Sequence, residues 1–553
     1  GPLGGCQTLL RGELERCHAE LFSRAHILEK ARASDMLEEQ FGTKIIDAPV
    51  HYKSAVNFLP KEHCHVEVLG GHSVRSTPRS AVVDSVISPY VEQIMGIDPA
   101  WGPPKLSGGF YPYQVALANI AHQSLEIGDE LVTATLCYQQ CFNDIYKVLP
   151  ELFDADDGFR PLDDVEIVCG RNGKRFIDPM NLSTSPGFPF TGDKRNLVEP
   201  YVEYTGDVKE PKRFVAEIRN AIIAAENKLA NRERIYVPWK AALKDEPTKK
   251  TKTKTRVFQC APLVIQAILR KYYLPIIRIM QLNSIRTECA VGCNAEGTEW
   301  EQLYHYMMTH PNRFGGDYSA YDQRMPAQLI SAAFKILIGV TKYSTSYSDR
   351  DRVIMASIVS EIVNPIIIYD GAVLMLFGSN PSGQNLTVII NCIVNCLLLR
   401  CAYYSIYPSS KLGDFRKHVT IQTYGDDVLG SVSNKRKRFN VISVSAYLDR
   451  YNIKFTNPGK ERAERAFLED HELEFLKRTN HFNVDLGHEV GILAESSIHK
   501  RLHVHLLSPE LSMREHSAVN IDTCLKDYFF YGREKYEEMY SQLLRVAEAA
   551  NIK

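Results

Sequence analysis

The stretch IQTYGDDVLGS, residues 421–431, has the pattern of a β-hairpin with two acids at its tip. Apolar and polar residues alternate over 419–424, and the alternation continues over 428–432, as expected for a strand and its returning partner. Asp426 and Asp427 lie between the two runs. Aspartate pairs are common at turns because aspartate favours turns. Adjacent carboxylates nevertheless repel each other, and a cation between them would remove that cost.

A third acid is placed to join this pair. Asp317 follows a short apolar lead-in within FGGDYSAYDQRMP, residues 314–326, and an amphipathic run over 327–340 predicts a helix after it. A strand end and a hairpin tip on neighbouring strands can converge, which would gather Asp317, Asp426 and Asp427. Magnesium prefers carboxylate and phosphate oxygens. Two such ions about 3.5–4 Å apart are the known arrangement for in-line phosphoryl displacement.

Composition indicates an ordinary globular protein. The chain has 553 residues, 44% hydrophobic and 24% charged, which predicts several domains or one large enzyme. The formal net charge of −1 excludes a global basic field, so an anionic partner must be held by local clusters. Thirteen cysteines, an odd number, without a signal-peptide pattern predict free thiols in a reducing compartment.

The most apolar stretch, residues 386–406, contains Asn391, Asn395 and Arg400. These polar residues predict a buried helix and not a bilayer span, and we expect no transmembrane segment. The opening residues 1–4, GPLG, are typical of what remains after a purification tag is cut off.

Five other segments have recognisable local patterns. Residues 181–192 form a loop rich in Ser, Thr, Gly and Pro, and residues 244–256 carry six Lys or Arg against two acids. Threonines alternating with lysines in that basic run favour a β-hairpin. Residues 111–150 and 211–231 each predict a helix, and the tail is mostly helical in pattern, especially over 521–550.

Taken in order, these strings resemble the viral RNA-dependent RNA polymerases of the picornavirus-like group. The matching strings are STSPGFPF (183–190), KDE…KTKTR (244–256), GGDYSAYD (315–322), NPSGQNLTVIINCIVN (380–395), YGDD (424–427), NPGK (457–460) and FLKR (475–478). Each is weak alone, and the ordered set, over about 183–478, is specific. The flanks and the AYDQRMP context lean toward a dicistrovirus or an iflavirus.

The resemblance implies an α+β fold shaped as a closed right hand. The palm would be a small antiparallel sheet backed by helices, and the thumb would be helical. The implied division is fingers over 1–272, palm over 273–360, a fingers insertion over 361–381, palm again over 382–478, and thumb over 479–553.

The resemblance also assigns the metal ligands. Asp317 and Asp426 would hold two Mg²⁺ ions, with Mn²⁺ as the alternative, and Asp427 would be an outer or alternate ligand. The backbone carbonyl of Tyr318 is similar in position to one that binds metal in the family. Lys460 would be the general acid that protonates the leaving pyrophosphate; on sequence alone it equally fits a surface lysine in a turn.

Recognition of the nucleotide sugar is expected at Asp322 and Asn391. An acid and an amide together accept from and donate to ribose hydroxyls, and deoxyribose would leave them unpaired. The alternative for Asn391 is a satisfied buried amide. Ser382 and Gly383 resemble a flexible loop near the sugar, and Thr387 would orient Asp322 or Asn391.

The basic run is expected to bind the triphosphate. Arg256 resembles the family's arginine over the incoming base, and Lys244 resembles another phosphate ligand. Lys250, Lys252 and Lys254 would line the entrance. The alternative is a solvated charged loop.

Two short strings are assigned to the RNA strands. Thr184, Ser185 and Gly187 would touch the template backbone, where small residues allow close approach. Lys477 and Arg478 would grip the primer strand.

The implied activity is template-directed RNA synthesis from ribonucleoside triphosphates, replicating a positive-strand RNA virus genome. The expected partners are the RNA template, the nascent RNA, nucleoside triphosphates and a small protein primer. The expected location is the host cytoplasm, at membrane-associated replication complexes. The alternatives are a reverse transcriptase, a non-catalytic RNA-binding protein with a palm-like shell, and a metal-dependent nuclease.

Overall fold

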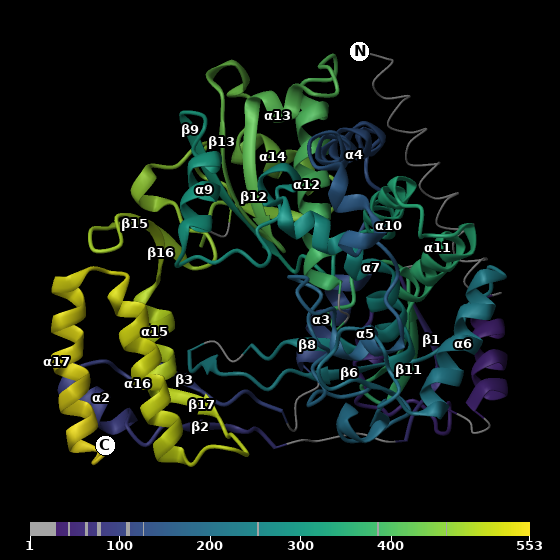
Figure 1. Cartoon of the computed structure of the whole chain (residues 1–553), viewed down its shortest axis with the longest axis horizontal. Helices are drawn as coiled ribbons and strands as arrows, with labels where there is room; N and C mark the ends of the chain where they lie inside the picture. The colour runs from purple at the N-terminus through teal and green to yellow at the C-terminus, as the bar shows by residue number, and fades with distance from the viewer. Residues whose placement is uncertain are drawn as a thin grey trace.

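The computed structural model describes most of the chain. Figure 1 shows one sheet with its helices at the top, a second sheet at the lower right, and the C-terminal helices at the lower left beside an N-terminal helix. The described residues are 29–41, 45–60, 65–73, 79–106, 111–124, 126–251, 254–383, 386–459 and 462–553. Residues 1–4 lie outside them.

The predicted hairpin is confirmed as the centre of a four-stranded antiparallel sheet. Its strands are β12 (Val419–Tyr424), β13 (Asp427–Val432), β9 (Asn312–Ser319) and β14 (Lys454–Thr456), in the order β12-β13-β9-β14. Asp317 lies on β9, so the strand expected before it is also confirmed.

Both faces of this sheet are buried, although its alternating pattern suggested one polar face. Val428 packs in the main core with α12 (Thr387–Ile406), whereas its neighbour Leu429 packs with Trp300 of α9 (Thr298–Met307). Two of the buried polar side chains are partners across the hairpin, since the Thr420 and Ser431 hydroxyls hydrogen-bond at 2.8 Å. Helices on both sides therefore fix the hairpin rigidly.

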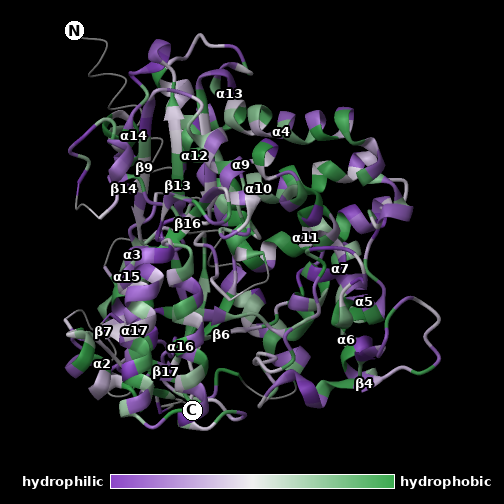
Figure 2. Ribbon diagram, turned by 60° about the vertical axis from the view of Figure 1, so that its left-hand side comes forward, coloured by the Kyte–Doolittle hydropathy of each residue, from purple (hydrophilic) through white to green (hydrophobic). Residues whose placement is uncertain are grey.

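Helix α12 is the central helix of the core. It contacts α4 (Glu130–Val148), α10 (Ala327–Val340) and α14 (Val441–Asp449). In the part of the chain that the structure describes, α12 alone is long and apolar enough to cross a membrane, yet 89% of its most apolar window is buried inside the protein. Figure 2 shows it as a largely hydrophobic helix inside the fold. It is a core helix, as its sequence predicts.

A buried ion pair next to the four-stranded sheet supports strand β12. The Arg400 guanidinium on α12 lies 2.6 Å from the Glu288 carboxylate, and both side chains have no exposed surface. Arg400 also lies over the Phe415 ring, 4.4 Å from its centroid. The Glu288 carbonyl accepts hydrogen bonds from the amide and hydroxyl of Thr423 on β12, at 2.8 and 2.7 Å. The ion pair therefore anchors the strand that leads into the hairpin tip.

A second, five-stranded sheet joins distant parts of the chain. Its order is β1 (Val66–Gly71), β11 (Ala372–Leu376), β10 (Ile366–Tyr369), β6 (Trp239–Leu243) and β8 (Val257–Cys260). Only the β10–β6 pair is parallel. The segment predicted as a fingers insertion, 361–381, thus supplies two strands to a sheet made otherwise of the N-terminal part.

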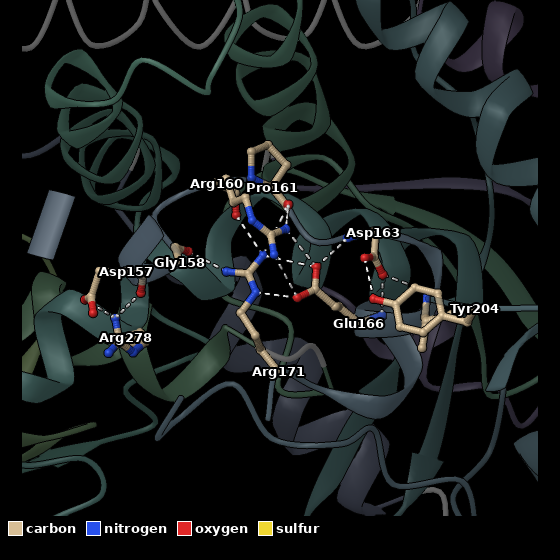
Figure 3. A network of polar contacts seen from close by, with 10 residues as sticks. Asp157, Gly158, Arg160, Pro161, Asp163, Glu166, Arg171, Tyr204 and Arg278 are labelled. Carbon is tan, nitrogen blue, oxygen red and sulfur yellow. Dashed lines mark hydrogen bonds and ion pairs between the residues drawn. The ribbon is translucent and has the colours of Figure 1, made fainter. Parts of the chain in front are cut away.

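A polar network fixes the part of this region that precedes the Ser/Thr/Gly/Pro loop (Figure 3). Glu166, on α5 (Asp164–Cys169), is buried between Arg171 at 2.5 Å and Arg160 at 2.9 Å. Although burial opposes its ionisation, the two guanidinium groups lower the pKa of Glu166 to about 2. Arg171 also donates a hydrogen bond to the Gly158 carbonyl. Residues 158–171 are therefore tied into one unit.

The C-terminal part is helical, as predicted, and also holds N-terminal residues. It contains the hairpin β15 (Arg478–Asn483) and β16 (His488–Leu493), followed by α15 (Glu495–His503) and β17 (Val504–Leu506). Strand β17 pairs with β2 (Val82–Asp84), and Ile87 and Val91 of the N-terminal part share a hydrophobic cluster with the C-terminal helices.

The predicted domain boundaries fall at these positions in the fold. The boundary after 272 lies inside the continuous helix α7 (Leu263–Leu282), and that after 478 lies at the start of β15. Residues 82–97, assigned to the fingers, contact the assigned thumb. The division itself stays a prediction.

Two predicted helices are shorter than their patterns suggested, and the helical tail contains two helices. Residues 111–150 divide into α3 (Tyr111–Ala121) and α4, and close approach of the Tyr447 and Tyr451 hydroxyls leaves no room for a side chain at Gly128. Residues 211–231 yield α6 (Ala216–Ala230), because 212–214 pair as β5 with β4. Residues 521–550 divide at Gly532, whose φ is +108°.

The remaining elements are short strands and 3-10 turns, together with further helices, of which α16 and α17 pack on each other and α17 packs on α2. They are η1 (Ala55–Phe58), α2 (Ser88–Met95), β3 (Trp101–Gly102), η2 (Pro150–Phe153), η3 (Ala155–Asp157), η4 (Lys194–Leu197), β4 (Val198–Pro200), β5 (Lys212–Phe214), β7 (Thr248–Lys249), α8 (Ser284–Thr287), η5 (Thr341–Tyr343), α11 (Asp349–Val363), α13 (Asp414–His418), η6 (Asn434–Arg436), η7 (Asp470–Glu472), α16 (Met513–Phe529) and α17 (Arg533–Ala549).

Removing one member of the buried ion pair should destabilise the protein strongly. Arg400→Leu leaves the Glu288 carboxylate buried without its counter-charge, which costs about 3–5 kcal/mol in comparable sites. Arg533→Leu, which breaks an exposed pair with Asp485, should cost about 1 kcal/mol or less. Thermal unfolding midpoints measure both. The double variant Arg400→Leu/Glu288→Gln should recover part of the loss, and equal losses for Arg400→Leu and Arg533→Leu would contradict this account.

Candidate active site

The strand register brings the three predicted acids together. Val428 of β13 pairs with Gly316 of β9, so the next residue on each strand is Asp427 on one side and Asp317 on the other. Tyr424 pairs with Asp427, which places Asp426 at the hairpin tip, and Gly425 makes the tight turn with a φ of +60°. The convergence inferred from the sequence is therefore present.

The charges of these acids are largely uncompensated. Asp317 and Asp426 are exposed at their surfaces and Asp427 is half-buried. Desolvation by the surrounding protein, together with repulsion from Asp317 and Asp426, raises the pKa of Asp427 to about 7. The same two kinds of effect, with Asp317 as the repelling charge, raise the pKa of Asp426, against some relief from Arg256. An oxygen donor set with excess negative charge fits divalent cations of the magnesium type.

Two of the carboxylates are turned toward backbone donors. Oδ2 of Asp317 accepts from the Gly459 amide at 2.9 Å, and Oδ2 of Asp427 accepts from the Leu476 amide at 2.7 Å. Among the described residues, the set of three ligand-type side chains with donor atoms within 4.8 Å of one another is Glu301, His305 and Glu489, an ion-paired surface group. The three aspartates are therefore neighbours, but their carboxylate oxygens do not all lie within 4.8 Å of one another.

The predicted sugar-reading pair is in direct contact. Nδ2 of Asn391 donates to Oδ1 of Asp322 at 2.7 Å, and Nδ2 of Asn380 donates to Oδ1 of Asn391 at 2.9 Å. Desolvation, with a contribution from Asp426, raises the pKa of Asp322 to about 7. Asn380 was not assigned a role from the sequence, although it opens a quoted string. It fixes the orientation of the Asn391 amide.

The loop before α12 is held in place where it was predicted to be flexible. The amide and hydroxyl of Ser382 both donate to Oε1 of Gln259, at 3.1 and 3.2 Å. A Cβ at Gly383 would lie 1.7 Å from the Gln259 carbonyl oxygen, so only glycine fits there. The expectation of flexibility at Ser382 and Gly383 is therefore wrong, because strand β8 pins both residues.

Thr387 also differs from its predicted role. Its hydroxyl donates to the Pro381 carbonyl at 2.8 Å, and its carbonyl accepts from Nδ2 of Asn380 at 3.3 Å. Thr387 thus shapes the loop, and Asn380 is the residue bonded to Asn391. Sequence spacing could not separate these two roles, because both residues lie within one turn of the loop.

The basic run forms a hairpin only at its base. Strands β6 and β8 pair up to Leu243 and Val257, but Thr248–Lys249 pairs with Trp101–Gly102 of β3. Residues 248–249 therefore pair with the N-terminal segment and not within the run. This long-range pairing cannot be predicted from the local sequence pattern. Lys252 lies outside the described residues.

The arginine of this run is already held by an acid. Nε and Nη2 of Arg256 donate to Glu246 at 2.6 and 2.7 Å, and Lys244 lies 3.7 Å from the same carboxylate. Asp322 and Asp426 also act on the Arg256 charge, which raises its pKa further after the larger effect of Glu246. Arg256, Lys244 and Lys254 are all exposed. Arg256 is thus a residue of the basic run whose charge also interacts with Asp322 and Asp426.

The residues predicted to contact RNA divide into exposed and buried ones. Thr184 and Ser185 are exposed, as a template contact requires, and so is Lys477. Gly187 is buried, with a φ of +75° and space for a Cβ only 2.6 Å from the Ala261 carbonyl, so it supports its loop and does not face RNA. Nη1 of Arg478 donates to the Gly491 carbonyl at 2.7 Å, which makes it a structural residue of the β15–β16 hairpin.

Lys460 lies outside the described residues. The turn before it is described, and the Gly459 amide that binds Asp317 belongs to that turn. Gly459 of this string is therefore next to Asp317, and the role of Lys460 stays a prediction.

Comparison with known proteins agrees with this geometry. The family model described as viral RNA-dependent RNA polymerase matches residues 151–490. The chain belongs to the viral RNA-dependent RNA polymerases. Within this family the polymerase resembles a solved structure, the Sicinivirus 3Dpol RNA-dependent RNA polymerase, with a TM-score of 0.67 and 19% identity, over 87% of this chain and 94% of that one. That likeness establishes the right-hand polymerase fold.

The polymerase is also similar to parts of larger viral proteins. It is 27% identical to the replicase polyprotein of Drosophila C virus over 68% of this chain, and 29% identical to that of Cricket paralysis virus over 54%. The RNA1 polyprotein of Tomato ringspot virus is 24% identical over 78%. The matched regions cover 22%, 18% and 19% of these polyproteins. The matches support the picornavirus-like group as a whole and do not single out insect viruses.

The uncompensated acids should destabilise the metal-free polymerase as pH rises. The folded-state pKa of Asp427, about 7, lies above its ordinary value of 3.8, so the folded state binds the proton more tightly and loses stability between those pH values. Asp427→Asn should therefore raise the unfolding midpoint in EDTA at pH 8, with a difference that fades toward pH 4. Asp449→Asn, at an exposed ion pair, is the control and should give no increase. A midpoint lowered at pH 8 by Asp427→Asn would contradict the proposed repulsion.

Proposed function

We propose that this polymerase extends an RNA strand on an RNA template, by attack of the terminal 3′-hydroxyl on the α-phosphate of a ribonucleoside triphosphate. The observation that carries the proposal is the convergence of Asp317, Asp426 and Asp427 beside the Asp322–Asn391 pair and Arg256. Template pairing would select the base, and the protein would check the sugar and the shape.

Asp317 and Asp426 would hold two divalent ions, with Mg²⁺ as the first choice and Mn²⁺ as the alternative. Asp427 would be the outer or alternate ligand, and the Tyr318 carbonyl would complete the set. When bound, the ions would lower the pKa of the attacking hydroxyl and offset charge on the pyrophosphate. The acids would also have to turn from their present backbone donors, since Asp317 and Asp427 each use one oxygen there.

The chain's own residues would place the nucleotide. Asp322 and Asn391 would receive the ribose hydroxyls, while Arg256, Lys244 and Lys254 would meet the triphosphate charge. Glu246 holds Arg256 at 2.6 and 2.7 Å, so a triphosphate would compete with a carboxylate for this arginine. Lys460 would protonate the leaving pyrophosphate from a turn already bonded to Asp317.

The RNA strands would lie on exposed residues of two loops. Thr184 and Ser185 would contact the template and Lys477 the primer strand, each through backbone phosphates or sugars. In the cell, the polymerase would copy a positive-strand RNA genome in the host cytoplasm, at membrane-associated complexes, starting from a small protein primer. The similarity to viral replicase polyproteins supports this setting.

Primer extension tests the proposed reaction. Wild-type protein should lengthen a labelled RNA primer on an RNA template, whereas Asp426→Asn should lose extension by several orders of magnitude while retaining RNA affinity. Asp449→Asn, a surface carboxylate, serves as the matched control. Extension retained in Asp426→Asn, or shortening of the RNA by wild type as a nuclease would produce, would contradict the proposal.

Sugar selection tests the Asp322–Asn391 pair separately. Asn391→Ala removes the amide that orients Asp322, so the preference for NTP over dNTP should fall by on the order of 10-fold, as for the loss of a buried hydrogen bond. The ratio of kcat/KM for the two substrates measures it. Asn380→Ala should give a smaller loss in the same direction, because it acts through Asn391. An unchanged ratio in Asn391→Ala would assign the amide to packing. A wild-type preference for dNTP would instead indicate a reverse transcriptase.

A further inference from the structure

One buried amide touches both strands that carry the acids. Asn395 of α12 has no exposed surface. Its Nδ2 donates to the Gly425 carbonyl at 3.1 Å and to the Asp427 carbonyl at 3.3 Å. Its Oδ1 accepts from the Tyr318 hydroxyl at 3.0 Å. Both hydrogens of the amide and its oxygen are thus used at the active site.

Each of these partners is one of the acids or its neighbour in the chain. Gly425 and Asp427 flank Asp426 in the hairpin, and Tyr318 directly follows Asp317 on β9. A bond from one amide to each group therefore links the β9 acid to the hairpin acids through a side chain. The pairing of β9 with β13 stops short of this link, since the last residue pair between the two strands is Gly316 with Val428.

A neighbouring thiol completes the contact from α12. Sγ of Cys392 accepts from the Gly425 amide at 3.0 Å, and the Cys392 side chain is fully buried. Cys392 and Asn395 are three residues apart, so they share one helix face. Asn391, one residue earlier, holds the sugar-reading Asp322. Helix α12 therefore contacts both the hairpin and Asp322, and it fixes their relative position.

The acids give this link a specific task. Asp317, Asp426 and Asp427 carry like charges on neighbouring strands, and their repulsion would push the hairpin away from β9 when no cation is bound. The pairing of β13 with β9 does not reach the tip, and the tip residue Asp426 is exposed. A hydrogen bond inside the dry core is worth more than one at the surface, because its groups have no water to turn to.

We propose that Asn395 is a positioning residue for the catalytic acids, holding the hairpin tip against β9 before cations bind. It touches neither substrate nor metal and acts through Gly425, Asp427 and Tyr318. The proposal rests on the assignment of the three acids as the metal site, and it assigns Cys392 the supporting role at Gly425.

The test uses full-length protein and two readouts. The first is hydrogen–deuterium exchange of a peptide covering 419–432 in metal-free protein. Asn395→Leu should speed the exchange of this peptide, because the Gly425 and Asp427 carbonyls lose the hydrogen bonds that Asn395 donates to them. Asn520→Leu, which removes another buried amide bonded to the Arg501 carbonyl in the C-terminal helices, is the control and should leave that peptide unchanged. Unchanged exchange in Asn395→Leu would overturn the proposal without reference to activity.

The second readout is a double-mutant cycle with Tyr318→Phe, which removes one hydroxyl and is the variant least disruptive to folding. Tyr318→Phe alone should lower kcat and raise the Mg²⁺ concentration for half-maximal primer extension, with nucleotide KM nearly unchanged. Asn395→Leu should raise that Mg²⁺ concentration about 10- to 100-fold, as for loss of a residue that orients metal ligands. In the Asn395→Leu background, Tyr318→Phe should have no further effect.

Effects that multiply across the cycle would show that Tyr318 and Asn395 act independently, which contradicts a shared link. A lower unfolding midpoint with an unchanged Mg²⁺ requirement would assign Asn395 to stability alone. Failure of the proposed reaction is distinguishable, because Asp426→Asn would then still extend primers whatever the exchange of residues 419–432 shows.

Discussion

Repulsion among three carboxylates is the constraint around which this fold is arranged. Asp317 and Asp427 lie on two antiparallel strands and Asp426 lies at the adjoining hairpin tip, and the pairing of Gly316 with Val428 brings the three acids together. The raised pKa values of Asp426 and Asp427 indicate that the protein does not neutralise these two acids. A site that is unfavourable alone and favourable with divalent ions is what phosphoryl transfer needs.

The surrounding core resists that repulsion by rigidity. Helix α12 packs on one face of the sheet and α9 on the other, and the Arg400–Glu288 pair anchors β12 through Thr423. The same helix presents Asn391 to Asp322 and Asn395 to the hairpin. The residues proposed to read the sugar and those proposed to bind metal therefore share one support, which makes their relative position a property of a single buried helix.

Contacts between distant segments bring the anion-binding groups to this core. Strand β8 pins Ser382 and Gly383 and leads back to Arg256, while Thr248–Lys249 pairs with the N-terminal segment at Trp101–Gly102. That N-terminal segment continues to the C-terminal helices through β2 and β17. The parts assigned as fingers and thumb are thus connected through residues far apart in sequence, consistent with a closed hand.

The sequence by itself determined the hairpin at 421–431, the strand at Asp317, the buried helix after 386 and the order of motifs, because these depend on local periodicity and turn chemistry. It also identified Asp322 with Asn391, since their chemistry is complementary. Only the tertiary structure decided which way side chains turn. It directed Asp317 to Gly459, tied Arg478 to Gly491, buried Gly187, and pinned the Ser382–Gly383 loop predicted to be flexible. Each of these depends on contacts between residues far apart in the chain, and no local pattern records them.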